Sequence, residues 1–285
     1  MNLFSTLETH FTNLDNCPLI ESKIFESEQQ KERYESYIMF AFRKFRSLSY
    51  HLSNVNDLWR KEADSLLEEI VDLPEMEGAS SVRSTMKVNK DSFDFTYELS
   101  AFLGALKSCL DLLSETTSFY MKGISVNFSI STLLKQVDKK KGNILAFVEL
   151  HSNWIRTVRD YRHPLLHRLV LNARSGYEIH RFNDKTSRVL YPVLIPETTP
   201  AFVPDTRQTR MMNDDLPNLS YSEQTITRIN DGIEEVSDFQ INVEPSQGYV
   251  RIEDFMKKHE AKCEKFFIEL IETLDKLDFS FDTCT

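Results

Sequence analysis

Glycine is scarce in this chain, with seven residues among 285. So few glycines argue against a β-barrel, a β-sandwich or a fold that binds nucleotides through a glycine-rich loop. The chain also lacks a Walker loop, a GxGxxG fingerprint, a GxSxG elbow and any paired-carboxylate cluster with metal spacing. ATPase, Rossmann oxidoreductase and α/β-hydrolase activities therefore have no support in the sequence, and we predict no cofactor.

Targeting and membrane segments are missing as well. The N-terminus, MNLFSTLETHFTNLDN, has neither the basic start nor the apolar core of a signal peptide. The longest apolar run, YIMFAF at 37–42, is too short to span a bilayer. The cysteines are scattered without a CxxC pair: Cys17, Cys109, Cys263 and Cys284. Such cysteines are typical of reduced thiols, so we expect a cytoplasmic protein that does not contact a membrane.

The charge of the chain is unevenly distributed. The net charge is −10, and residues 62–77 are strongly acidic. Between 135 and 174 the sign reverses, and the only acids are Asp138, Glu149 and Asp160. The cations there are Lys135, Lys139, Lys140, Lys141, Arg156, Arg159, Arg162, Arg168 and Arg174. Salt confines electrostatic fields to about 10 Å, so this stretch is compatible with a polyanionic ligand despite the acidic total.

Apolar residues recur every three or four positions in four long segments, which is the pattern of amphipathic helices. The segments are 34–52 with a possible extension to 70, 95–113, 144–158 and 252–274. A short helix is predicted at 131–138, and Asn143 is a candidate cap for the helix that follows. We predict a mainly α fold, an antiparallel helical bundle. It would form one domain over 1–285, with a helical core at about 29–175 and 251–278.

Residues 177–250 depart from this periodicity. YEIHRF, NDKTS and RVLYPVLI predict a small β-hairpin, and residues 196–246 are rich in proline and polar side chains. We interpret 196–246 as a long loop with fragments of structure, inserted before the last helix. Loops of this length often bind ligands or act as lids, although a surface excursion explains the composition equally well.

The stretch VRDYRHPLLHR at 158–168 gathers three arginines and two histidines around Pro164. On one continuous helix Arg162 and His167 would point about 140° apart. A proline disfavours helical geometry at the preceding residue and prefers a first helical turn. We therefore predict a break near His163 and a new helix from Pro164 to Gly176. Arg162, His167 and the free N–H groups of that helix would then converge on one anion.

Such a site could cleave RNA without a metal. Arginine binds two phosphate oxygens at once, and histidine transfers protons at neutral pH. RNA supplies its own nucleophile, the 2′-hydroxyl, so a phosphate clamp and a proton shuttle can suffice. Two proton-transferring groups would be provided by His163 and His167, or by one His167 from each half of a dimer.

The motif from Arg162-His163 to His167 resembles the Arg-(polar)-xxx-His form of the Arg-x4–6-His motif of HEPN domains. Arg156 and His163 also satisfy the six-residue spacing, so a second register exists. The likeness covers roughly 29–175 and the last helix, including ELSAFLGALKSCLDLLS at 98–114. One departure is Leu169, where a toxin subgroup has a tyrosine that receives AMP from its partner.

The resemblance implies a helical-bundle, metal-independent ribonuclease that leaves a 2′,3′-cyclic phosphate. HEPN proteins act in toxin–antitoxin, antiviral defence and CRISPR-associated systems, so a toxin-like role with an antitoxin or defence partner is implied. A homodimer with facing motifs is implied as well.

Roles for individual residues follow from this hypothesis. Arg162 would hold the phosphate, His167 would transfer the proton, and His163 would orient or assist. Further contacts to RNA phosphates are expected from Arg156, Arg159 and Arg168, and orienting roles for Glu98, Asp111 or Tyr161.

Several alternatives are compatible with the same residues. Arg159 and Arg162 could pair with Asp160 or Glu149, leaving His167 as a half-buried helix residue. His163 and His167 have zinc-ligand spacing, but no third ligand is evident and we predict no metal. In the main alternative the chain is a non-catalytic helical module. It would bind RNA, nucleotide or an acidic protein through the basic corner 156–174.

Overall fold

The chain divides into two compact units, each treated separately below. Unit 1 comprises Met1–Leu52, Ser100–His163 and Met256–Thr285, and unit 2 comprises Ser53–Leu99 and Pro164–Phe255. This computed structural model describes residues 2–17, 24–69, 83–91, 93–121, 129–167, 169–171, 174–182, 185–198, 210–212, 219–230, 233–245, 247–278 and 280–282. The prediction of one domain over 1–285 stays a prediction.

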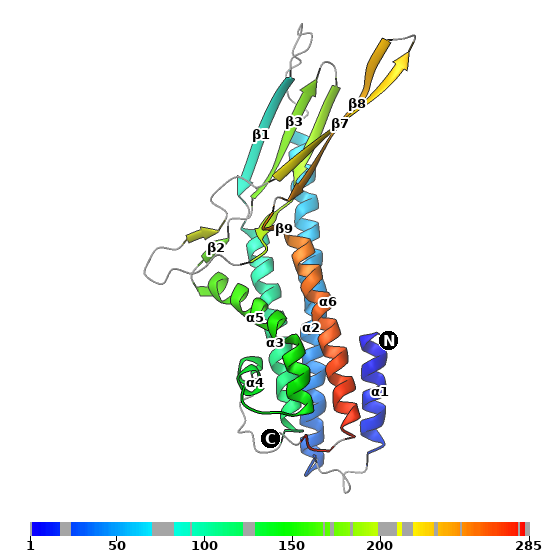
Figure 1. Cartoon of the computed structure of the whole chain (residues 1–285), viewed down its shortest axis with the longest axis vertical. Coiled ribbons are helices and arrows are strands. Elements are labelled where there is room, and N and C mark those ends of the chain that lie inside the picture. Colours follow the sequence, from blue (N-terminus) through cyan, green and yellow to red (C-terminus); the bar gives the residue numbers. More distant parts are fainter. Residues whose placement is uncertain are drawn as a thin grey trace. The chain divides into compact units, whose positions relative to one another are not determined.

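The fold is mainly helical, as predicted from the apolar periodicity. The helices are α1 (Leu3–Asp15), α2 (Glu28–Glu69), α3 (Asp94–Ser118), α4 (Ile130–Val137), α5 (Asn143–His167) and α6 (Ile252–Lys276) (Figure 1). The short helix expected at 131–138 is α4, and the pattern extending past Leu52 belongs to the long α2. Among the described residues, no helix combines the length and apolar character needed to cross a membrane.

The core of unit 1 consists of the predicted apolar stripes. On α2, Tyr34, Ile38, Ala41 and Leu48 are fully buried. On α6 the entire stripe from Met256 to Leu274 is buried, including one histidine. These helices pack together because each must remove one apolar face from water, and burial stabilises by roughly 25 cal/mol per Å².

A buried polar network attaches α1 to this core. His10 Nδ1 lies 2.6 Å from Asp275 Oδ1 on α6, and His10 Nε2 lies 2.9 Å from the Tyr34 hydroxyl on α2. The Tyr34 hydroxyl lies 3.2 Å from that of Tyr120. Buried polar groups require such partners, so the network fixes the position of α1 beside α6 (Figure 1).

The start of α5 differs from the sequence prediction. The Gly142 carbonyl accepts the first helical hydrogen bond from Ala146 N at 2.9 Å, so Asn143 is the first helical residue and not the cap. The buried carboxylate of Asp282 instead accepts from the backbone N–H groups of Asn143 (3.1 Å) and Ile144 (2.9 Å). A residue 138 positions away in sequence therefore caps this helix.

The predicted helix break at His163 is wrong, because α5 continues through Pro164 to His167. Proline inside a helix removes one hydrogen bond and strains the preceding turn, and α5 ends only three residues further on. The predicted helix from Pro164 to Gly176 is also wrong. Strand β2 (Leu169–Leu171) and the start of β3 (Arg174–Phe182) occupy this segment, since a short apolar run fits either type of structure.

The strands belong to unit 2. Strands β1 (Arg83–Asp91), β3 and β4 (Lys185–Tyr191) form an antiparallel sheet in the order β1-β3-β4. Strands β3 and β4 are the predicted hairpin, with Tyr177 opposite Leu190. Two short pairs are also present: β2 runs parallel to β6 (Arg210–Met212), and β5 (Leu194–Pro196) runs antiparallel to β9 (Tyr249–Arg251).

The interpretation of 196–246 as a loop is wrong over most of its length. Strands β7 (Leu219–Asn230) and β8 (Ile233–Pro245) form a long antiparallel hairpin there. β-Branched residues at Thr225, Ile226 and Thr227 favour a strand, and Asp231-Gly232 is a hairpin-turn dipeptide. The prolines before residue 219 led to the prediction of a loop for the whole segment, so the strand-forming residues after 219 were overlooked.

Candidate anion-binding site

Helices α3, α4 and α5 enclose a cavity of about 210 Å³ within unit 1. Its floor is apolar and buried: Leu110, Ile130, Leu134, Ile155 and Val158. Its polar lining consists of Lys107, Ser131, Arg159, Arg162 and His163. No carboxylate is among the described residues that line the cavity, and four of its five polar lining residues are basic. We call this the α3–α5 cavity.

The spacing along α5 explains how this helix reaches the cavity. Ile155, Val158 and Arg162 are separated by three and four residues, and His163 follows Arg159 by four. Residues at these separations share one helix face. The apolar members occupy the deeper turns, and the charged members follow toward the C-terminus of the helix. The basic corner of VRDYRHPLLHR is therefore continuous with the apolar face of α5.

Arg162 has the most unusual environment of these residues. Its Nε atom is buried and has no hydrogen-bond partner among the residues that the structure describes. Leaving a buried polar group unsatisfied costs about 1–3 kcal/mol, and native proteins contain few such groups. The predicted pairing of Arg162 with Asp160 or Glu149 is not among its described contacts. Arg162 therefore retains hydrogen-bonding capacity for a ligand.

Two other cations of the cavity already have carboxylate partners. Lys107 donates to Asp111 one turn later on α3, and Asp111 also accepts from the Ile130 backbone N–H at 3.2 Å. Arg159 donates from Nε and Nη2 to Asp160 at 2.9 and 2.8 Å. Both members of the Arg159 pair are more than half exposed, and such pairs contribute little to stability. Arg159 can thus exchange this partner for another anion at small cost.

Other predicted site residues lie elsewhere. Arg156 is not among the residues that line the cavity, and its Nη2 lies 3.8 Å from Asp138 Oδ2. Glu98 belongs to unit 2 and accepts from Asn54 Nδ2 at 3.0 Å. Tyr161 is buried in the core of unit 1, and burial raises the pKa of its hydroxyl well above the usual range. The predicted orienting roles of Glu98 and Tyr161 stay predictions.

The end of the motif lies where the structure describes no side chains. His167 is the last residue of α5 and belongs to unit 2, and its side chain lies outside the described residues. Arg168 also lies outside them. The helix start that was expected to complete the anion site at Pro164 does not exist, because α5 is continuous there. Of the predicted residues, the cavity brings together Arg159, Arg162 and His163.

Sequence reasoning missed Lys107 and Ser131. Lys107 is a single cation inside the apolar helix 98–114, and Ser131 lies in the short helix α4. The pairing of Lys107 with Asp111 four residues later follows from helix geometry, but the approach of α4 to α3 and α5 does not. One signal in the sequence was Asp111, an acid inside the apolar helix 98–114, and its carboxylate accepts from the Ile130 backbone N–H at the start of α4.

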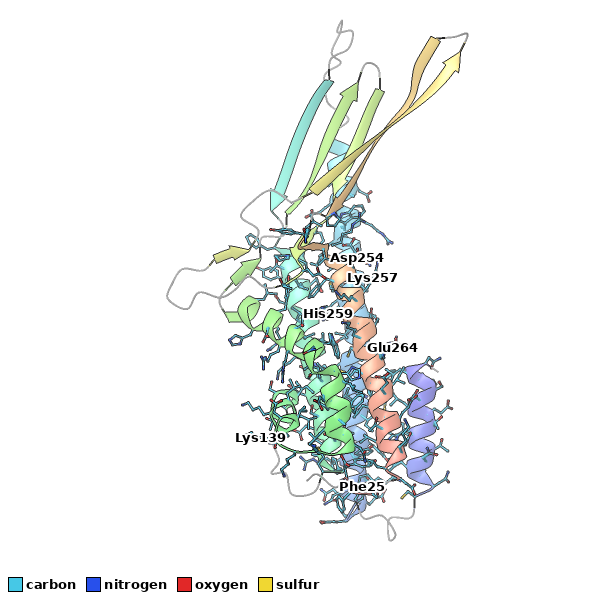
Figure 2. All side chains as sticks on the ribbon, viewed as in Figure 1. Phe25, Lys139, Asp254, Lys257, His259 and Glu264 are labelled. Atoms are coloured by element: carbon cyan, nitrogen blue, oxygen red, sulfur yellow. The ribbon has the colours of Figure 1, made fainter. Side chains whose placement is uncertain are left out.

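Two histidines outside the cavity have partners within unit 1. His259 lies on α6 (Figure 2) and is buried. Its Nδ1 accepts a hydrogen bond from Trp154 Nε1 at 3.0 Å. His151 Nε2 lies 2.9 Å from Glu269 Oε2. Across the described part of the chain, no group of three or more His, Cys, Asp or Glu side chains is placed to hold a metal ion.

Comparison with known proteins adds no relatives. No protein-family model matches the chain, and neither the curated proteins nor the solved structures include a significant match. The resemblance to HEPN domains therefore stays a prediction based on the motif alone.

Proposed function

We propose that the α3–α5 cavity binds a phosphate group of RNA and that the chain is an RNA-binding helical module. The observation that carries this proposal is the buried Nε of Arg162, which has no hydrogen-bond partner among the described residues; Arg162 is one of four basic residues that line the cavity. A guanidinium in this state gains its missing hydrogen bond from an anion, and charge-assisted bonds of this kind are about twice as strong as neutral ones.

The size of the cavity supports a phosphate as the bound group. A volume of about 210 Å³ is below the roughly 300–1,000 Å³ typical of sites for whole drug-sized ligands. The apolar lining residues provide no partner for a base edge, whereas the side chains of Lys107, Arg159 and Arg162 carry hydrogen-bond donors. Phosphate contacts of this type position nucleic acid without reading its sequence.

Binding of labelled single-stranded RNA, measured by fluorescence anisotropy over a range of salt, tests this function. Arg162→Met should weaken binding by roughly tenfold to a hundredfold, the equivalent of about 1.5–3 kcal/mol for one charged hydrogen bond. The slope of log K against log salt should fall by about 0.7, since one fewer phosphate is neutralised. Lys265→Met is the matched control, because Lys265 is an exposed cation on α6 that does not line the cavity.

Equal affinities for the two variants would contradict the assignment of the cavity. A wild-type protein that does not bind RNA at low salt would contradict the function itself. Neither variant should unfold at a lower urea concentration than the wild type, which separates loss of binding from loss of folding.

Metal-independent cleavage of RNA is the second candidate, and one observation favours it. His163 lines the same cavity as Arg162, so a proton-transferring group adjoins the phosphate clamp. The 2′-hydroxyl would attack the phosphorus and the 5′-oxygen would leave, giving a 2′,3′-cyclic phosphate. His163 would accept the proton of the nucleophile and return it to the leaving oxygen.

An assay in EDTA with analysis of the product ends distinguishes the candidates. Cleavage that leaves cyclic phosphate and is lost in His163→Ala, with RNA binding retained, would establish the nuclease. The predicted role of His167 is tested by His167→Ala in the same assay. If the wild-type protein binds RNA but does not cleave it, the RNA-binding module remains as the proposed function.

A further inference from the structure

One outward face of α2 in unit 1 is polarised in charge. Helix positions are about 100° apart around the axis, so each residue of α2 has a direction relative to Met39. Nine residues lie within about 60° of Met39 by this measure: Glu28, Glu32, Glu35, Ser36, Met39, Phe42, Arg43, Arg46 and Tyr50. All nine are exposed or half-buried. We call this set the Met39 face.

The signs of charge on the Met39 face change at Met39 itself. Glu28, Glu32 and Glu35 precede it, and Arg43 and Arg46 follow it. The helix dipole favours acids in a first turn and cations in a last turn, which accounts for Glu28 alone. The two arginines lie in the middle of α2, which continues to Glu69. The helix dipole therefore does not explain why the glutamates and arginines of this face are separated.

The spacing of these charges is symmetric about Met39. Glu35 and Arg43 lie four residues on either side, which is about 6 Å along the axis at 1.5 Å per residue. Glu32 and Arg46 lie seven residues on either side, about 10.5 Å. A second α2 that runs antiparallel, related by a two-fold axis at Met39, would place arginines at the heights of glutamates on both sides.

We propose that the Met39 face is the interface of a symmetric homodimer in which two α2 helices pack antiparallel. Met39 contacts the Met39 of the second copy. Glu32 and Glu35 of each copy lie opposite Arg43 and Arg46 of the other. Interfaces of this symmetry must be self-complementary, because the same patch meets itself, and the Met39 face satisfies this condition.

The apolar residues of the face suit burial in an interface. Met39 is 40% exposed and Tyr50 is 63% exposed. Methionine, tyrosine, phenylalanine and arginine are the residue types enriched in protein interfaces. Met39 occupies the centre, where removal from water contributes most, and the charges surround it.

Helices α1 and α6 contact α2 beside the Met39 face. Lys31 binds Asp15 of α1 at 3.1 Å, and Ser49 donates to Glu260 of α6. Both lie about 80° to one side of Met39 by helix geometry. The 23 positions from Glu28 to Tyr50 cover roughly 33 Å by 10 Å, which alone is small for a specific interface. The dimer is therefore expected to be weak and salt-sensitive.

A second copy fits this face better than other partners. Nucleic acid would suit the arginines but would be repelled by three glutamates on the same face. A basic protein would suit the glutamates and be repelled by the arginines. An antiparallel copy of the same helix satisfies both halves at once, and like charges opposite each other would penalise a parallel arrangement.

Charge reversal tests the interface through sedimentation velocity from micromolar to millimolar protein at low salt. The wild type should dimerise with increasing concentration. Arg43→Glu/Arg46→Glu makes the face uniformly acidic, and Glu32→Arg/Glu35→Arg makes it mostly basic, so each variant alone should be monomeric. An equimolar mixture of the two should dimerise again, because each then meets the opposite charge.

Arg33→Glu/Lys44→Glu is the matched control, since it changes net charge as much as the first variant but lies about 120–140° from Met39. It should dimerise like the wild type. A wild type that stays monomeric over the whole concentration range would overturn the proposal. It would also be overturned if both face variants dimerised like the control, or if their mixture remained monomeric.

Discussion

The buried pair of Trp154 and His259 predicts how stability depends on pH. His259 is 3% exposed, and its Nδ1 accepts a hydrogen bond from the Trp154 indole. Burial, followed by the nearby charges of Lys262 and Lys258, lowers the pKa of His259 from 6.5 to about 4. A proton on Nδ1 would also place two donors against each other, so the folded state holds this imidazole neutral.

The direction of the effect follows from where each state binds the proton. Between pH 6.5 and 4 the unfolded chain protonates this histidine and the folded chain does not. Folding is therefore fully stabilised above that range and loses stability as the pH falls through it. With pKa values of 6.5 and about 4, the loss between pH 7 and pH 5 is about 2 kcal/mol.

Urea unfolding of wild-type protein and His259→Asn at pH 7 and pH 5 measures this loss. The asparagine oxygen can accept the Trp154 hydrogen bond but does not titrate. The variant should be less stable at pH 7, since it packs less well, and should depend less on pH. The difference between the two proteins should shrink by about 2 kcal/mol at pH 5. Trp59→Phe leaves Trp154 as the only tryptophan, so its fluorescence reports on unit 1.

Parallel loss of stability in both proteins would refute the reasoning. That result would mean that other groups account for the pH dependence and that His259 binds its proton equally in the folded and unfolded states.

Three further substitutions have defined outcomes in urea unfolding. Asp282→Ala should lower the free energy of unfolding by roughly 2 kcal/mol, because it removes the cap of α5; a loss below half of that would contradict the role of the distant cap. Tyr34→Phe should cost about 1–3 kcal/mol by leaving His10 Nε2 buried without its partner, and an unchanged midpoint would mean that the network is not closed. Arg162→Met should leave stability equal or higher, since it removes an unsatisfied buried N–H; clear destabilisation would indicate a structural arginine.

The helices were predictable because their periodicity is a local property of the sequence. The stripe from Met256 to Leu274 is buried as its spacing predicts, and so are Ile144 and Val158 on α5. Helix geometry determines which residues share a face, and the hydrophobic effect determines that the apolar face turns inward. The β3–β4 hairpin was predictable for the same reason, from alternation and turn residues.

The errors occur where local preference competes with something else. Pro164 disfavours helical geometry at His163, yet α5 continues through both residues. One missing hydrogen bond near the end of a helix costs little compared with the stabilisation that the packing of the whole helix provides. Leu169 to Leu171 form a strand because they have a partner in β6, and strand partners are not encoded in the segment itself. Asp282 caps α5 because the segment that follows α6 lies against the start of α5.

Half of the candidate site followed from the sequence. The clustering of Arg159, Arg162 and His163 is visible in VRDYRHPLLHR, and it led to the prediction of an anion site. Lys107 and the apolar floor from α3 and α4 were not foreseen, since they join the cavity only through helix packing.

The sequence by itself determined where the long amphipathic helices lie, which of their faces are apolar and where the basic residues gather, since these depend on spacing along one chain. Tertiary structure decided that α3, α4 and α5 surround Arg162, that its Nε is left without a described partner, and that Asp282 reaches Ile144. These features depend on contacts between distant segments, whose energies depend on packing in three dimensions and not on the pattern of any one helix.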